Sequence, residues 1–141
     1  MSLIRTIIAQ AVLNSTDLTM KHGDAAWQNM FADDTTGTAV FLHDPLKLRF
    51  DNLVFLQESY PVVISFLQKS ELGYSPEDHD GNTDYPRTLM RSFVAWCRDN
   101  KDLIADFKVT EAVELWNLFD ANLDGWMLYC TIKPANAGPA C

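Results

Sequence analysis

The feature that most constrains the fold is a nearly continuous apolar run from Tyr60 to Leu67, with adjacent β-branched residues at Val62, Val63 and Ile64. β-branched side chains favour extended backbone. An apolar run without polar alternation is typical of a strand buried on both faces. Pro61 is compatible with this interpretation only near the start of the strand, because proline has no N–H to donate to a neighbour. The run therefore predicts a strand inside a sheet.

The composition supports one folded domain covering residues 1–141. Hydrophobic residues make up 48% of the chain, and 19 Asp+Glu against 11 Lys+Arg give a formal net charge of -8. This apolar fraction excludes a disordered chain. The acidity argues against a duplex nucleic-acid binder and against docking on anionic membranes, both of which need Lys and Arg. It does not argue against a protein that lines a passage through which DNA slides without sticking.

Cysteine usage and hydropathy favour a soluble protein made in a reducing compartment. Cys97, Cys130 and Cys141 are odd in number, widely spaced and without a CxxC pair, so they predict neither a disulfide framework nor a zinc site. The apolar stretch at the N-terminus is cut too early for a signal peptide. No run approaches the roughly 20 apolar residues of a membrane span.

Hydrophobic periodicity predicts a helix at the N-terminus and strands after it. A helix is expected over residues 2–14, because its apolar residues recur at helical spacing: Leu3, Ile4, Ile7, Ile8, Ala11 and Val12. A strand is expected over 38–43. Leu46, Leu48 and Phe50 then alternate with charged residues, which predicts a half-exposed ribbon that Leu53 to Leu56 extend or return.

The middle of the chain carries a helix-start signature. Ser75-Pro76-Glu77-Asp78 combines an N-cap residue, a first-turn proline and acids near the positive end of the helix dipole. We expect this helix to break at Gly81 and to restart at Pro86, with an apolar face continuing to Arg98. A short helical turn is expected over 103–107.

The last third predicts a hairpin. Residues 113–119 and 126–133 both alternate, and the Asp/Asn/Gly-rich segment 120–125 between them is a turn signal. Pro134 is expected to end the second strand. Residues 134–141 form a short tail of small residues.

The segment from Asp120 to Gly125 also copies the first half of an EF-hand loop. Asp120, Asn122 and Asp124 occupy ligand positions 1, 3 and 5, and Gly125 occupies position 6. The second half does not match, because position 12 is Thr131 in place of a bidentate Glu. A turn of left-handed geometry explains the same residues. Calcium binding by Asp120, Asn122 and Asp124 is therefore the alternative function. The alternating oxygens of Asp78, Asp80, Asn82 and Asp84 read mainly as a solvated loop, with an opportunistic cation site as the alternative.

No catalytic motif is visible, and we expect neither enzymatic activity nor a cofactor nor a resident metal. His22, His43 and His79 do not pair at metal-ligand spacing, and GxSxG, HExxH, P-loop and GxGxxG patterns are all missing. His43 has the chemistry of a general base but no accompanying nucleophile motif. Cys97 reads as core packing. An enzyme with a spatially assembled site is the third hypothesis.

Three segments together resemble a known group of proteins: Tyr60 to Leu72, the Ser75 to His79 helix start, and the Leu118 to Gly125 turn with the terminal Cys141. The combination resembles small virion proteins of Bacteroidetes (crAss-like) phages and prophages, of the tail-terminator or head–tail connector type. The resemblance covers roughly residues 38–141. It implies an α+β fold, tail-terminator-like, in which an antiparallel sheet carries helices packed on one face and the α+β body spans 38–133.

The same resemblance implies a structural role without chemistry. Copies of such proteins form a homo-oligomeric ring, commonly of six or twelve subunits, at the neck or tail of the virion. The implied partners are other neck or tail proteins such as portal, adaptor or tube, and genomic DNA that passes through without sequence-specific binding; a membrane is not among them. The implied location is the virion, and the host cytoplasm before assembly. The ribbon is then an arm toward a neighbour, with interface candidates Leu46, Leu48, Phe50, Leu53 and Phe55, and an excess of carboxylates should face the DNA passage.

Overall fold

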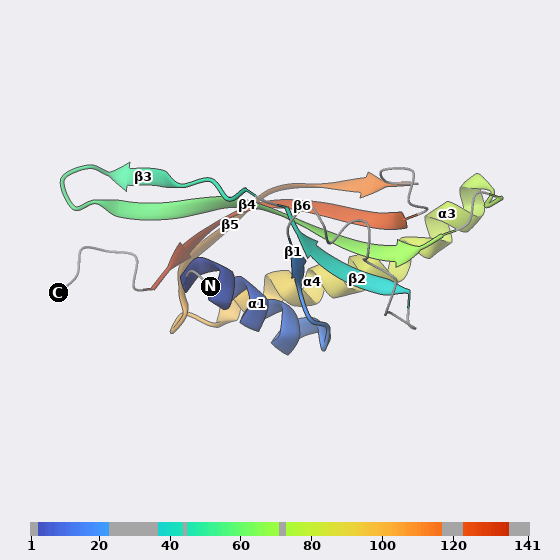
Figure 1. Ribbon diagram of the computed structural model, residues 1–141, viewed down its shortest axis with the longest axis horizontal. Helices are drawn as coiled ribbons and strands as arrows, with labels where there is room; N and C mark the ends of the chain where they lie inside the picture. Colours follow the sequence, from blue (N-terminus) through green and yellow to red (C-terminus); the bar gives the residue numbers. More distant parts are fainter. Residues whose placement is uncertain (1–2, 23–36, 44, 71–72, 117–122, 136–141) are drawn as a thin grey trace.

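The computed structural model describes residues 3–22, 37–43, 45–70, 73–116 and 123–135. The chain forms a six-stranded, mostly antiparallel sheet with helices packed on one face (Figure 1). This confirms the expected α+β fold class. In chain order the elements are α1 (Leu3–Thr16), β1 (Lys21–His22), β2 (Thr38–Leu42), β3 (Arg49–Asn52), β4 (Gln57–Lys69), α3 (Pro76–Asn82), α4 (Asp84–Asp99), β5 (Ile104–Leu115) and β6 (Leu123–Pro134).

Strand β4 is the centre of the sheet. The strand order is β1-β2-β4-β6-β5, and β3 pairs with the beginning of β4 outside this path. Val62, Ile64 and Phe66 of β4 face the helices and are buried. Ser65 and Leu67 are also buried on the far face, which we define as the sheet face turned away from α1 and α4. The predicted strand buried on both faces is therefore confirmed from Ile64 onward, whereas Tyr60, Pro61 and Val63 remain partly exposed.

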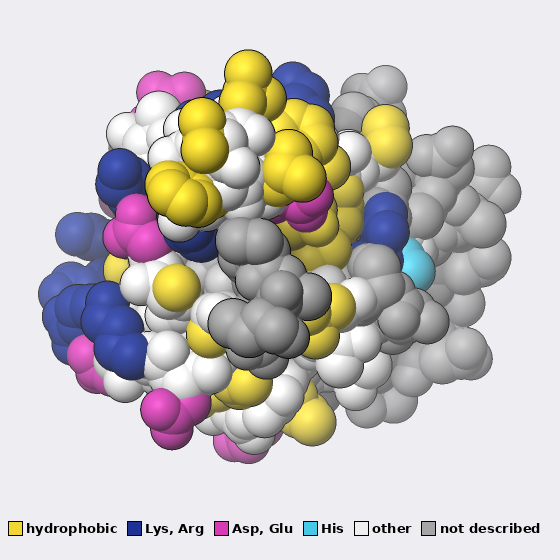
Figure 2. All heavy atoms as spheres, turned by 90° about the vertical axis from the view of Figure 1, so that its left-hand side faces the viewer, with side chains coloured by type: hydrophobic (Ala, Val, Ile, Leu, Met, Phe, Trp, Pro, Cys, Tyr) yellow, Lys and Arg dark blue, Asp and Glu magenta, His cyan; other side chains and the backbone are white. Residues whose placement is uncertain are grey.

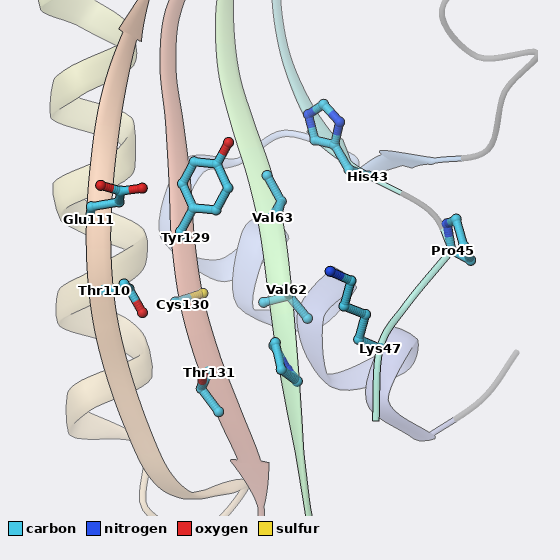
Figure 3. A pocket seen from close by; sticks show the side chains of 11 residues that line it. His43, Pro45, Lys47, Val62, Val63, Thr110, Glu111, Tyr129, Cys130 and Thr131 are labelled. Atoms are coloured by element: carbon cyan, nitrogen blue, oxygen red, sulfur yellow. The ribbon is translucent and has the colours of Figure 1, made fainter. Parts of the chain in front are cut away.

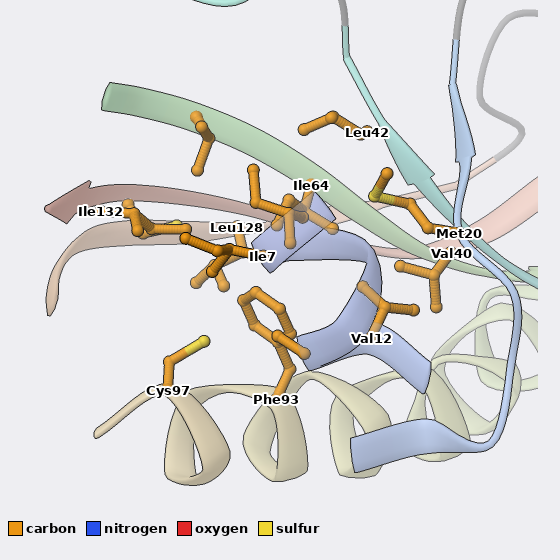
Figure 4. Close-up of a cluster of buried hydrophobic side chains, with 14 of the residues drawn as sticks. Ile7, Val12, Met20, Val40, Leu42, Ile64, Phe93, Cys97, Leu128 and Ile132 are labelled. Carbon is orange, nitrogen blue, oxygen red and sulfur yellow. The ribbon is translucent and has the colours of Figure 1, made fainter. Parts of the chain in front are cut away.

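The main core lies between the sheet and helices α1 and α4 (Figure 4). The apolar stripe predicted for the first helix is confirmed, because all of its residues except Leu3 are buried against this core. From α4, Phe93 packs against Phe66 of β4 with ring centroids 5.7 Å apart. The N-terminal helix runs two residues past the expected end, to Thr16, whose hydroxyl donates to the carbonyl oxygen of Val12.

The helix start at Ser75 is confirmed as a capping box. The Ser75 hydroxyl accepts from the Asp78 backbone N–H, the Asp78 carboxylate accepts from the Ser75 N–H, and Pro76 occupies the first turn. The expected break lies elsewhere: helix α3 ends at Asn82, and α4 begins at Asp84. Gly81 stays helical, and Pro86 sits in the first turn of α4, where its missing N–H is not needed.

The predicted hairpin is confirmed as β5 and β6, but both strands are longer than their alternation indicated. The helical turn expected over 103–107 is wrong, because β5 begins at Ile104 and Phe107 pairs with Ile132 of β6. Cross-strand pairing with β6 overrides the local pattern there. Asp124 and Gly125, expected in the turn, are strand residues of β6. Pro134 ends β6 as expected, while residues 136–141 of the tail lie outside the described residues.

Gly125 generates a prediction about stability. It lies opposite Leu67, and a Cβ placed on it would overlap the carbonyl of Phe66, whereas a Cβ on Gly81 meets nothing. We expect Gly125→Ala to reduce the free energy of unfolding by about 3 kcal/mol or more, because β4 and β6 must separate. Gly81→Ala is the control and should raise it by about 0.5–1 kcal/mol through helix propensity. Urea unfolding measures both; equal midpoints would contradict the close approach of the two strands.

Candidate functional site

The main candidate site is a two-stranded projection, which we call the arm: residues 49–59, comprising β3, the turn 53–56 and the first residues of β4. Pairing of β4 with β6 begins only at Tyr60, so the arm extends beyond the rest of the sheet (Figure 1). At about 3.3 Å per residue, its tip lies on the order of 15 Å from the point where β6 pairing begins. The arm thus carries side chains away from the domain's own core.

The turn at the tip is held by Asn52. Its side-chain oxygen accepts the backbone N–H groups of Val54, at 2.9 Å, and Phe55, at 3.2 Å. Such local bonds organise a turn without help from a core. Leu56 completes the turn with a φ of 49°, a left-handed conformation that is unfavourable for a residue with a large side chain. The tip is therefore ordered, and it keeps a leucine where glycine or asparagine is the usual choice.

Polar contacts hold the base of the arm. The Asp51 carboxylate accepts from Arg49 Nε of the same strand at 3.0 Å and from Ser59 Oγ of the opposite strand at 3.1 Å. Desolvation acts to raise the pKa of Asp51, but the hydrogen bonds from Arg49 and Ser59 outweigh it and lower that pKa. On β6, Lys133 donates to the side-chain oxygen of Gln57 at 3.0 Å. These contacts fix the direction in which the arm leaves the sheet.

The tip itself is apolar and exposed. Leu53, Val54, Phe55 and Leu56 are 76%, 85%, 55% and 57% exposed. Figure 2 faces the end of the molecule that carries the arm and shows hydrophobic side chains gathered at its top. Single exposed apolar residues are ordinary on protein surfaces, but a contiguous group marks an interaction site. Four consecutive exposed apolar residues on an ordered turn form such a group.

The structure separates the five predicted interface candidates. Leu48, Phe50, Leu53 and Phe55 are exposed on or beside the arm, whereas Leu46 is half-buried and packs against the core. The prediction omitted Val54 and Leu56, which are as exposed as their neighbours. The sequence signal for these two residues is the unbroken apolar run 53–56. Strand alternation places only every second residue on an exposed face, whereas a turn exposes all four.

Asp124 is engaged inside the protein and does not face a loop. It is fully buried, and its carboxylate oxygen lies 2.7 Å from His79 Nδ1 and accepts from the Asn82 amide at 3.1 Å. His79 is itself stacked on Trp116 with ring centroids 5.3 Å apart. The other two proposed calcium ligands, Asp120 and Asn122, lie outside the described residues.

The second acidic motif is helical. Asp78 caps α3 and Asn82 donates to the Lys69 carbonyl, so these two side chains have structural partners, while Asp80 of α3 and Asp84 of α4 are exposed. Among the residues that the structure describes, no group of three or more His, Cys, Asp or Glu side chains is placed to hold a metal ion.

The nucleophile candidates are buried. His43 Nε2 lies 2.6 Å from Ser65 Oγ, a pairing that no sequence motif indicated, but Ser65 is completely buried in the sheet. Burial raises the pKa of the Cys97 thiol to about 12 and also raises that of Cys130. Both thiols therefore stay protonated at neutral pH, which is typical of core packing and not of a reactive cysteine.

Comparison with known proteins adds no relative: no protein-family model matches the chain, and no curated protein matches it. Within the described ranges, no helix combines the length and apolar character needed to cross a membrane.

The left-handed residue at the tip yields a second prediction. Leu56→Asn should raise the free energy of unfolding by up to about 1 kcal/mol, because asparagine adopts positive φ more readily than leucine. Leu53→Asn is the matched control: it removes another exposed leucine from the same turn at ordinary φ, and we expect little change. Chemical denaturation of both variants provides the comparison, and an equal response would show that Leu56 carries no backbone strain.

Proposed function

We propose that this chain is a structural subunit that assembles with further copies of itself through the apolar tip of its arm. The specific setting that we propose is a homo-oligomeric ring at the neck or tail of a phage virion, as a head–tail connector or tail-terminator subunit. The observation that carries the assembly proposal is the ordered, solvent-exposed group of Leu53, Val54, Phe55 and Leu56.

The first support is energetic. The tip side chains leave most of their surface in water, yet burial of apolar surface is worth roughly 25 cal/mol per Å². Aromatic and large aliphatic side chains that fill a partner's pocket supply most of the affinity in protein interfaces. Such a group therefore gains stability only when a second surface covers it.

The second support is preorganisation. Because Asn52 already holds the turn, and Asp51 and Lys133 hold the base, binding freezes little additional backbone. Ordering entropy is a major cost of association, and a preformed element avoids much of it. Retention of leucine at a position of positive φ fits the same role, since strain of this kind clusters at binding elements.

The virion setting rests on the sequence resemblance and on the charge. A net charge of -8 suits a ring through which DNA must pass without binding. A subunit whose protruding arm differs from the surface that receives it makes head-to-tail contacts, and these form rings when the rotation closes. The proposed partners remain the neighbouring neck and tail proteins, with DNA as a passing polymer.

Light scattering coupled to size exclusion tests the assembly. We expect the wild-type chain to form a discrete oligomer, and Phe55→Asp to be monomeric with an unchanged far-UV spectrum, because a charge on the tip cannot be buried without a partner. Tyr85→Asp is the matched control: Tyr85 is an aromatic residue of similar exposure, 53%, on α4 and away from the arm. It should keep the wild-type mass.

Two results would count against the proposal. A wild-type chain that stays monomeric at the highest attainable concentration, or a Phe55→Asp variant that assembles normally, would remove the role of the arm. Negative-stain images test the ring separately, since open filaments in place of closed rings would contradict it.

A further inference from the structure

The far face of the sheet carries a hollow at the end nearest the arm (Figure 3). Its volume is about 230 Å³. Val63 of β4 and its cross-strand partner Tyr129 of β6 line it together with Pro61. Lys47 stands on one side, in the segment that leads into β3, and Glu111 of β5 stands on the other. Helix α1 lies behind the strands in this view, so the hollow opens away from the main core.

We propose that this hollow receives the tip of the arm of a second copy of the chain, with Phe55 as the inserted side chain. The inference rests on the proposed function and names the surface that the arm binds. Each copy then uses two different surfaces: its tip inserts into one neighbouring copy, and its hollow receives the tip of another.

The size of the hollow favours a protein side chain as its occupant. Pockets that bind small molecules typically enclose about 300–1,000 Å³. At about 230 Å³, this one is smaller but sufficient for a single large apolar residue. Its apolar lining of valine, proline and tyrosine ring suits an aromatic side chain, which prefers contact with other rings and aliphatic groups.

The arm of the same chain cannot reach the hollow. Strand β4 is continuous from Gln57 in the arm to Val63 in the hollow, and six residues of extended strand span about 20 Å. Because a continuous strand cannot fold back on itself, Phe55 stays at a distance from the hollow of its own chain. The tip that fills the hollow must therefore come from another molecule, and a second copy supplies the same tip.

Charge complementarity supports this pairing. The hollow carries a cation, Lys47, on one side and an anion, Glu111, on the other. On the arm, Glu58 of β4 is an anion, whereas Arg49 of β3 already forms an ion pair with Asp51. An arm seated between the two sides sets Glu58 against Lys47. Such pairs at the rim of an interface fix the register of docking and exclude the opposite orientation.

The contact that results is head-to-tail. Because tip and hollow are different surfaces, a growing row of copies always has one free tip at one end and one free hollow at the other, until the row closes into a ring. This is the contact geometry that a ring requires, and it distinguishes the proposal from a two-fold dimer in which two tips meet.

Mixing two assembly-deficient variants tests the inference. Phe55→Asp has an inactive tip and an intact hollow, whereas Val63→Trp fills the hollow and keeps the tip. We expect each to be monomeric alone and an equimolar mixture to form a one-to-one dimer and nothing larger. Val113→Trp is the control, since Val113 lies on the same face of β5 but outside the hollow; it should assemble as wild type.

A charge swap between Lys47 and Glu58 provides a second test. Lys47→Glu should raise the dissociation constant of the contact about tenfold or more, and adding Glu58→Lys in the same chain should restore it, because each contact then regains an opposite pair. Glu58→Lys alone should weaken assembly similarly.

The outcomes separate the two proposals. If Phe55→Asp abolishes assembly while Val63→Trp and Lys47→Glu assemble normally, the tip binds elsewhere: the inference is overturned and the proposed function stands. If Phe55→Asp itself assembles normally, the proposed function fails first. A mixture that stays monomeric, with both variants folded by circular dichroism, also overturns the inference.

Discussion

Strand β4 is the constraint on which the rest of the structure depends. Its later residues pair with β2 on one side and β6 on the other, and they are buried on both faces. Its first residues leave the sheet and pair only with β3. One continuous backbone is thus core at one end and arm at the other. A strand anchored by buried residues from Ile64 to Leu67 can hold a projection rigidly, because bending the arm means disturbing the core.

The helices depend on this sheet through two different kinds of contact. Helices α1 and α4 pack by burial of apolar side chains, with Phe93 against Phe66 as one central contact. The short helix α3 is fastened by polar contacts, since His79 and Asn82 both bond the buried carboxylate of Asp124. A buried carboxylate is costly unless it is paired. The residue that looked like a calcium ligand therefore has its partners within the fold.

Apolar residues are usually buried, but the apolar residues at the tip of the arm are exposed. Most apolar residues of α1 and β2 are buried in the core, but at the tip four consecutive apolar residues stay in water on a turn that Asn52 organises. The same molecule offers an apolar hollow bounded by Lys47 and Glu111 on the far face of its sheet. In the proposed assembly, the tip of one copy and the hollow of another cover each other without a change in the core of either copy.

The local patterns of the chain determine a good part of this structure. The apolar stripe of α1, the central strand, the capping box at Ser75 and the final hairpin all follow from spacing and capping chemistry, because those signals act over a few residues. Tertiary contacts decided the remainder. Pairing with Ile132 made Phe107 a strand residue where the local pattern indicated a helical turn. Asp124 is buried because His79 and Asn82 of α3 bind its carboxylate. Gly125 is a strand residue because β6 pairs closely with β4 beside Phe66. Spacing placed interface candidates on the ribbon, but it could not show that the turn exposes all of residues 53–56, or that Leu46 returns to the core. The hollow is assembled from β4, β5, β6 and the segment before β3, which are distant in sequence. The hollow forms because the strands pair in this register, and the register depends on which strands meet in space.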